Sequence, residues 1–112
     1  MTMRAYKYLS DILYAIEMIS QFLDATPTYF DYQKDLKTKS AVKRQLGIIG
    51  EAVNQFEKEN SGYTLSYSKE IINFRNRIIH AYDSVDDAVV WAIKTNHLPL
   101  LKEEIENILS IK

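Results

Sequence analysis

The sequence predicts an all-α fold, a four- to five-helix antiparallel bundle in a single domain over residues 1–112. Turn-forming residues are scarce, with three Gly and two Pro in the whole chain, whereas a sandwich or barrel needs a turn signal every ~10 residues. Apolar residues recur at spacings of three and four, the period of a helix with one buried face. A chain of 112 residues that is 46% hydrophobic can bury one core but not two.

The first helix is expected over residues 2–24, and Thr26-Pro27 stops it because the residue before a proline avoids the α region. A short helix is expected within residues 28–36. The stripe of the first helix is Ala5, Leu9, Ile12, Ile16, Ile19 and Leu23, widened by Tyr8, Leu13 and Phe22. The residues expected to pack inward from the short helix are Tyr29, Phe30 and Tyr32.

The second long helix is expected over residues 38–59, ended by Asn60-Ser61-Gly62. Gly47 and Gly50 lie inside it, and each costs up to about 1 kcal/mol relative to Ala in a helix interior. We therefore expect a neighbouring helix to approach closely along the glycine face. The buried stripe of this helix is Val42, Leu46, Ile49, Val53 and Phe56.

A third helix is expected over residues 68–81, with Ser66 or Ser68 as its cap. The last helical stretch should cover residues 85–111. Asn96-His97-Leu98-Pro99 interrupts it, which predicts two helices or one bent helix, because proline lacks a backbone donor. The residues of the third helix that should face the core are Ile71, Phe74 and Ile78.

Composition narrows the function. Cysteine is absent, which excludes disulfides and thiolate chemistry. The first residues do not form a signal peptide, and no uncharged run approaches the ~20 residues of a membrane span, so a soluble, cytoplasmic protein is expected. The net charge is −1, so nucleic acid could be held only by a local patch. The basic residues at 34–44 are more simply a solvated helix face. No acidic or histidine cluster predicts a metal, and we expect no cofactor.

Polar side chains crowd into two turns of the third helix. At 100° per residue, Asn76 and His80 lie about 40° apart on the helix surface, and Arg75 lies about 140° from His80. One copy of this helix makes a lopsided site, whereas two copies about a two-fold axis would surround one cleft, so we expect a homodimer. The segment reads Arg75-Asn76-Arg77-Ile78-Ile79-His80-Ala81-Tyr82.

Arginine and histidine together suit metal-free cleavage of RNA. Histidine can take or give a proton near neutral pH, and arginine can hold a phosphate at two points and stabilise charge in the transition state. The alternative is that the spacing arises by chance, because a lone helical histidine usually has a structural role.

Three blocks of sequence carry a resemblance that covers nearly the whole chain. Residues 75–82 resemble the arginine, four residues, histidine, any residue, tyrosine motif of the HepT-like toxins of the HEPN superfamily. Ile48-Ile49-Gly50-Glu51-Ala52 is similar to the signature of the family's second helix. Val89-Val90-Trp91, followed by Leu98-Pro99-Leu100-Leu101, is similar to its C-terminal pattern.

The resemblance implies a homodimeric ribonuclease toxin of a type VII-like toxin–antitoxin pair, whose partner is a nucleotidyltransferase antitoxin. It places RNA cleavage on Arg75 and His80, with Asn76 in support. It makes Tyr82 the residue on which the antitoxin places AMP to silence the toxin.

Other residues have two interpretations. Glu51 could orient Arg75 or Asn76, or form a surface or interhelix salt bridge. Arg77 could bind phosphate, but an exposed helical arginine is the simpler interpretation. Trp91 is expected in the core or a dimer interface, and His97 in a structural role.

A second class of function stays open. It is a non-catalytic HEPN module that docks a nucleotidyltransferase or holds a nucleotide in the polar cleft.

Overall fold

The computed structural model describes residues 1–80 and 86–110, and at residues 79 and 80 it describes the backbone alone. Every regular element of the described chain is helical, which confirms the all-α class. With α5, η2 and α6 counted as one continuous helix, the described helices number five. The elements are α1 (Met3–Leu23), α2 (Tyr29–Lys34), α3 (Leu36–Lys58), α4 (Ser68–His80), α5 (Asp87–Ala92), the π-helical η2 (Ile93–His97) and α6 (Leu98–Ser110).

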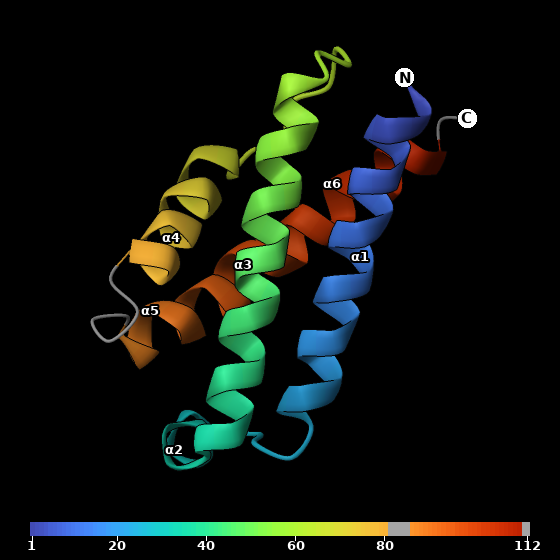
Figure 1. Cartoon of the computed structure of the whole chain (residues 1–112). Coiled ribbons are helices and arrows are strands. Elements are labelled where there is room, and N and C mark those ends of the chain that lie inside the picture. Colours follow the sequence, from blue (N-terminus) through green and yellow to red (C-terminus); the bar gives the residue numbers. More distant parts are fainter. Residues whose placement is uncertain (81–85, 111–112) are drawn as a thin grey trace.

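The long helices form an antiparallel bundle with α3 at its centre (Figure 1). α1 packs along one side of α3 and α4 along the other. The stretch from α5 to α6 crosses the bundle diagonally, so that the end of α6 lies beside the start of α1. None of the described helices is both long and apolar enough to cross a membrane.

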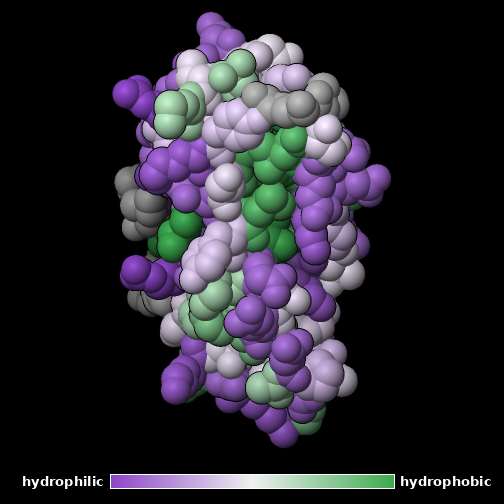
Figure 2. Space-filling model, turned by 90° about the vertical axis from the view of Figure 1, so that its right-hand side faces the viewer, coloured by the Kyte–Doolittle hydropathy of each residue, from purple (hydrophilic) through white to green (hydrophobic). Residues whose placement is uncertain are grey.

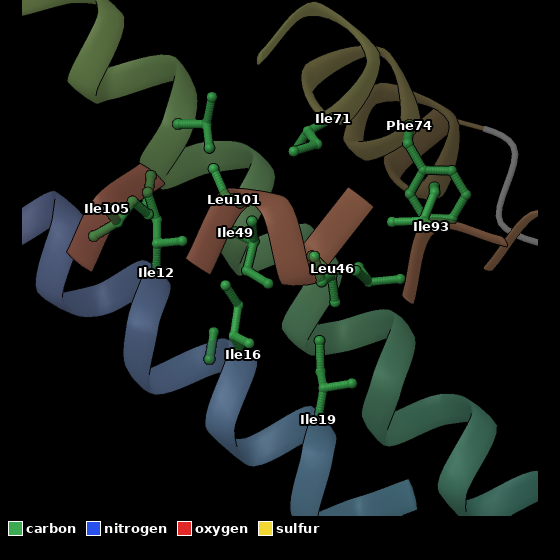
Figure 3. Packing of buried hydrophobic residues seen from close by; sticks show 14 of the residues in the cluster. Ile12, Ile16, Ile19, Leu46, Ile49, Ile71, Phe74, Ile93, Leu101 and Ile105 are labelled. Atoms are coloured by element: carbon green, nitrogen blue, oxygen red, sulfur yellow. The ribbon is translucent and has the colours of Figure 1, made fainter. Parts of the chain in front are cut away.

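The core lies where α1, α3 and α6 meet, and α4 adds to it from the side. Figure 3 shows side chains of all four helices pointing toward one another. The predicted stripes are the buried positions, because a spacing of three and four keeps a residue on one side of a helix. Tyr8, Leu13 and Phe22 are partly buried against this core, as expected.

The expected inward packing of the short helix is right for Tyr32 and wrong for Phe30. Tyr32 is fully buried, Tyr29 packs against the core, and Phe30 is 61% exposed. A helix as short as α2 offers only one face to the bundle, so neighbouring residues cannot all point inward. Phe30 instead carries the ammonium group of Lys34 over its ring, 3.9 Å from the centroid.

Side chains close the first turns of α1, α2 and α3. Thr2 accepts from the backbone N–H of Ala5 at 3.0 Å, and Thr28 does the same for Asp31 at 3.1 Å. Asp35 accepts from Thr38, and these hydrogen bonds hold the pKa of the Asp35 carboxyl below its usual range. The expected cap of α4 differs, because the Ser66 hydroxyl and N–H bind the carboxylate of Glu104 on α6 and Ser68 is already the first helical residue.

The predicted interruption near Pro99 is a π-helical segment between α5 and α6. The N–H of Leu98 donates to the carbonyl of Ile93, five residues back, and the backbone on either side stays helical. His97 lies in this segment and packs edge-on against Tyr67, with ring centroids 4.5 Å apart, which agrees with a structural role.

Candidate functional site

The site begins where α4 crosses α3 at Gly50. A Cβ atom at Gly50 would lie 2.3 Å from the Cβ and 2.8 Å from the Cγ of Arg75, closer than real side chains approach. The expected close approach is therefore right for Gly50 and wrong for Gly47. A Cβ at Gly47 would have no neighbour within 4 Å among the described residues.

The guanidinium of Arg75 is held from two sides. Its Nη2 forms an ion pair with Oε2 of Glu51 on α3, and its Nη1 donates to Oδ1 of Asn76 at 3.2 Å. The other carboxylate oxygen of Glu51, Oε1, accepts from Nε2 of Gln55 at 2.8 Å. Glu51 therefore forms the expected interhelix salt bridge, and because its partner is Arg75, the same contact allows the orienting role.

Gln55 is a member of this cluster that the sequence reasoning missed. A signal for it exists, because Glu51 and Gln55 are four residues apart and side chains at that spacing are neighbours on a helix. The sequence does not show that Arg75 lies next to Glu51. Only with that position known does the hydrogen bond from Gln55 bear on the site.

Arg75 keeps the capacity to bind an anion. A guanidinium carries five N–H donors, and Glu51 and Asn76 together engage only part of that set. The side chain of Arg75 is 25% exposed and that of Glu51 is 43% exposed, so the pair lies at the edge of the α3–α4 contact. A phosphate could therefore approach the guanidinium from solvent.

Three further predicted site residues, Asn76, Arg77 and His80, belong to α4. Asn76 and Arg77 are exposed. His80 is the last residue of α4, and its side chain lies outside the described part of the chain. Tyr82 also lies outside the described residues.

Trp91 has neighbours within its own chain. Its ring centroid is 5.7 Å from that of Tyr29 and 5.4 Å from that of Tyr32, and the ammonium group of Lys94 lies 4.2 Å from its ring. These contacts favour packing within the bundle, the first of the two roles expected for Trp91.

Basic residues at 34–44 also form contacts within the chain. Lys39 forms an ion pair of 2.8 Å with Asp87 at the start of α5, and Lys34 lies over Phe30. The side chains of Lys39 and Asp87 are only 18% and 20% exposed, so the expected solvated helix face is wrong for Lys39, which packs against the start of α5. Within residues 1–80 and 86–110, no group of three acidic or histidine side chains could hold a metal ion.

A separate groove of about 400 Å³ lies between α1 and α6. Figure 2 shows that side of the molecule, with a strip of hydrophobic surface along its middle. Among the predicted site residues whose side chains the structure describes, none lines the groove. Its lining residues include Ile16, Ile19, Leu23, Leu98 and Pro99, with Glu17, Asp24, Lys94 and Lys102 also contributing.

A small helical bundle with an arginine, four residues and a histidine at the end of one helix is a domain of the HEPN class. Residues 12–108 match the family model described as "Ribonuclease HepT-like". The chain belongs to this HepT-like ribonuclease family.

Curated relatives extend over almost the same length. The chain is 36% identical over 110 residues to "Probable ribonuclease HepT" of Thermococcus cleftensis, covering 94% of this chain and 96% of the relative. It is 33% identical to "Putative RNase MJ0127" of Methanocaldococcus jannaschii, covering 91% and 84%. It is 31% identical to "Putative RNase TTE0752" of Caldanaerobacter subterraneus subsp. tengcongensis, covering 91% of each. No solved structure gives a significant match.

Proposed function

We propose that this ribonuclease-family protein is a metal-independent endoribonuclease whose site combines Arg75, Asn76 and His80. The observation that carries the proposal is the guanidinium of Arg75, fixed at the α3–α4 contact by Glu51 and Asn76 and still open to solvent. Family membership supports RNA as the substrate.

Each residue has a role that its chemistry allows. His80 removes the proton of the RNA 2′-hydroxyl or protonates the leaving 5′-oxygen, since imidazole exchanges protons near neutral pH. The 2′-oxygen attacks the adjacent phosphorus and the bond to the 5′-oxygen breaks, leaving a 2′,3′-cyclic phosphate and a 5′-hydroxyl. Arg75 binds the phosphate and stabilises the charge that develops on its oxygens. Asn76 and Glu51 support Arg75.

The chemistry predicts a set of activity losses in the purified chain. His80→Ala should remove nearly all cleavage while the free energy of unfolding stays within about 1 kcal/mol of wild type, because the change affects chemistry and not the core. Arg75→Ala should do the same. Arg75→Lys should recover little activity, since an ammonium group cannot grip a phosphate at two points. Gel assays of a labelled RNA in EDTA, with analysis of the product ends, measure these effects.

The same assay separates the proposal from its alternative. Full dependence of cleavage on added magnesium would reject the mechanism. A folded wild-type chain that cuts no RNA in either condition would instead favour the docking module, for which the near-neutral net charge of −1 is the supporting observation.

We further propose control by a nucleotidyltransferase antitoxin that adds AMP to Tyr82, two residues beyond His80. The added phosphate would compete for Arg75 and repel the RNA backbone. With ATP and the cognate partner, wild type should gain AMP-sized mass increments and lose cleavage, whereas Tyr82→Phe should keep at least part of its cleavage and gain none. Intact-mass spectrometry measures the increments. Increments that persist in Tyr82→Phe would place the modification on another residue.

A further inference from the structure

Two residues of α3, Gly50 and Glu51, lie against Arg75, and a third, Gln55, binds Glu51. Gly50 lies directly under the first carbons of its side chain, and the backbone of α4 at Ile71 is also close, with its carbonyl 3.3 Å from where a Gly50 Cβ would be. Any larger residue at position 50 would push the Arg75 side chain away. Glycine therefore sets how closely the side chain of Arg75 lies against α3.

The polar end of Arg75 is fixed by the next turn of α3. Glu51 directly follows Gly50 and binds Nη2, and Gln55, one turn later, holds the opposite oxygen of the same carboxylate at 2.8 Å. A carboxylate bound through both oxygens has little freedom to rotate. The guanidinium is thereby oriented by a hydrogen-bond chain that runs from Gln55 through Glu51 to Arg75.

The arrangement suits orientation better than stability. The Glu51–Arg75 pair is partly exposed, and ion pairs near solvent contribute little to the free energy of unfolding. Arginine otherwise samples many rotamers, and a group that must meet a phosphate at two points gains from being held in position beforehand.

We propose that Gly50, Glu51 and Gln55 form a positioning bracket for Arg75, with Gln55 acting on the guanidinium only through Glu51. The expected effect of the bracket on catalysis rests on the proposed ribonuclease function. Its expected effect on the order of the Arg75 side chain does not, and can be measured in the protein without RNA. None of the three bracket residues touches the reacting phosphate, so they are positioning residues and not catalytic ones.

The bracket predicts a graded loss of turnover. Glu51→Ala should lower kcat by roughly 10- to 100-fold, the scale of loss when a catalytic group is displaced by about 1 Å. KM should change less, because Arg75 keeps its charge and still attracts RNA. Gln55→Ala should lower kcat less than Glu51→Ala, and Glu51→Gln, which can still accept a hydrogen bond, should fall between wild type and Glu51→Ala. Glu57→Gln, a change to a carboxylate later in α3, is the matched control and should resemble wild type.

Two readouts separate positioning from a loss of fold. The first is the NMR signal of the Arg75 Nε–H in the full chain without RNA, with the exposed Arg77 on the same helix as internal reference. Arg75 should be ordered in wild type and in Glu57→Gln, and should become as mobile as Arg77 in Glu51→Ala. The second is a double-mutant cycle, in which Glu51→Ala should have almost no effect on cleavage once Arg75 is already Lys.

The possible results separate a failure of the positioning bracket from a failure of the proposed ribonuclease function. Wild-type cleavage that depends on Arg75 but is unchanged in Glu51→Ala and Gln55→Ala would overturn the bracket and leave the ribonuclease standing. A wild type that cuts no RNA would overturn the ribonuclease, and the Arg75 signal would still decide whether the bracket orders that side chain. An Arg75 signal equally mobile in wild type and Glu51→Ala would overturn the bracket in either case.

Discussion

The hydroxyl of Tyr32 is buried in the bundle beside Trp91, and it has no hydrogen-bond partner among the described residues. Its burial raises the pKa of the hydroxyl well above the ordinary value, and the nearby carboxylate of Asp87 and the Tyr29 side chain add to the shift. A buried phenol of this kind disfavours the folded state whenever the unfolded chain can ionise.

Tyr32→Phe should therefore change how stability depends on pH. The pKa of Tyr32 is higher in the folded than in the unfolded chain. Its pH-dependent contribution to the free energy of unfolding is therefore fully present below the unfolded-state pKa near 10, and is lost as the pH rises above that value. The wild type should lose more stability between pH 8 and pH 11 than Tyr32→Phe does. At pH 8 the variant should equal or exceed wild type by about 1 kcal/mol, because an unpaired buried hydroxyl is removed.

Urea unfolding at the two pH values measures the difference. Tyr14→Phe is the control, because Tyr14 is 68% exposed. This variant should lose stability between the two pH values in parallel with wild type. An equal loss of stability in Tyr32→Phe and in wild type would contradict a raised pKa of the Tyr32 hydroxyl in the folded protein.

At the scale of the helices, Gly47 and Gly50 differ only in what lies opposite them. Both are inside α3, three residues apart, and both cost helix propensity. Arg75 fills the space above Gly50, whereas the space above Gly47 is open among the described residues. The contact between α3 and α4 therefore depends on one glycine of the two.

The pair predicts opposite effects of the same substitution. Gly47→Ala should raise the free energy of unfolding by up to about 1 kcal/mol, through helix propensity alone. Gly50→Ala should lower it by roughly 1–3 kcal/mol, because the added methyl group overpacks the α3–α4 contact. Thermal and urea unfolding measure both changes. A stabilised Gly50→Ala would show that α4 can shift freely, and would contradict the packing described here.

At the scale of the whole molecule, α4 is covered by α3 on one side and carries exposed polar residues on another. Asn73, Asn76 and Arg77 are all exposed in the single chain. We propose a two-fold homodimer with the two α4 helices near the axis, so that one shared cleft would receive side chains from both copies.

The homodimer predicts a molecular mass of twice the chain by light scattering at micromolar concentration. Asn73→Glu should weaken the dimer, because a two-fold axis near α4 would bring the two new charges close together. Ser10→Glu, at an exposed position on α1, should leave the dimer intact. A wild-type monomer, or equal effects of the two substitutions, would argue against α4 at the axis.

The residue pattern by itself determined the helices and the polar segment of α4. The spacing of Leu9, Ile12 and Ile16 in α1, and of Leu46, Ile49 and Val53 in α3, predicted which face of each helix is buried. That information is local, because a helix repeats its geometry every few residues and needs no knowledge of its neighbours. The predictions for His80 and Tyr82 likewise come from sequence and remain predictions.

Only the tertiary structure decided which residues meet across helices. The sequence left open whether Glu51 would orient Arg75 or Asn76 or form a salt bridge, and the crossing of α4 over α3 makes Arg75 its partner. The same crossing places Arg75 against Gly50 and not against Gly47. The single inward face of α2 buries Tyr32 and leaves Phe30 exposed. These outcomes depend on the relative rotation and height of two packed helices. Those quantities are set by the fit of all their side chains together, and no single stretch of sequence contains them.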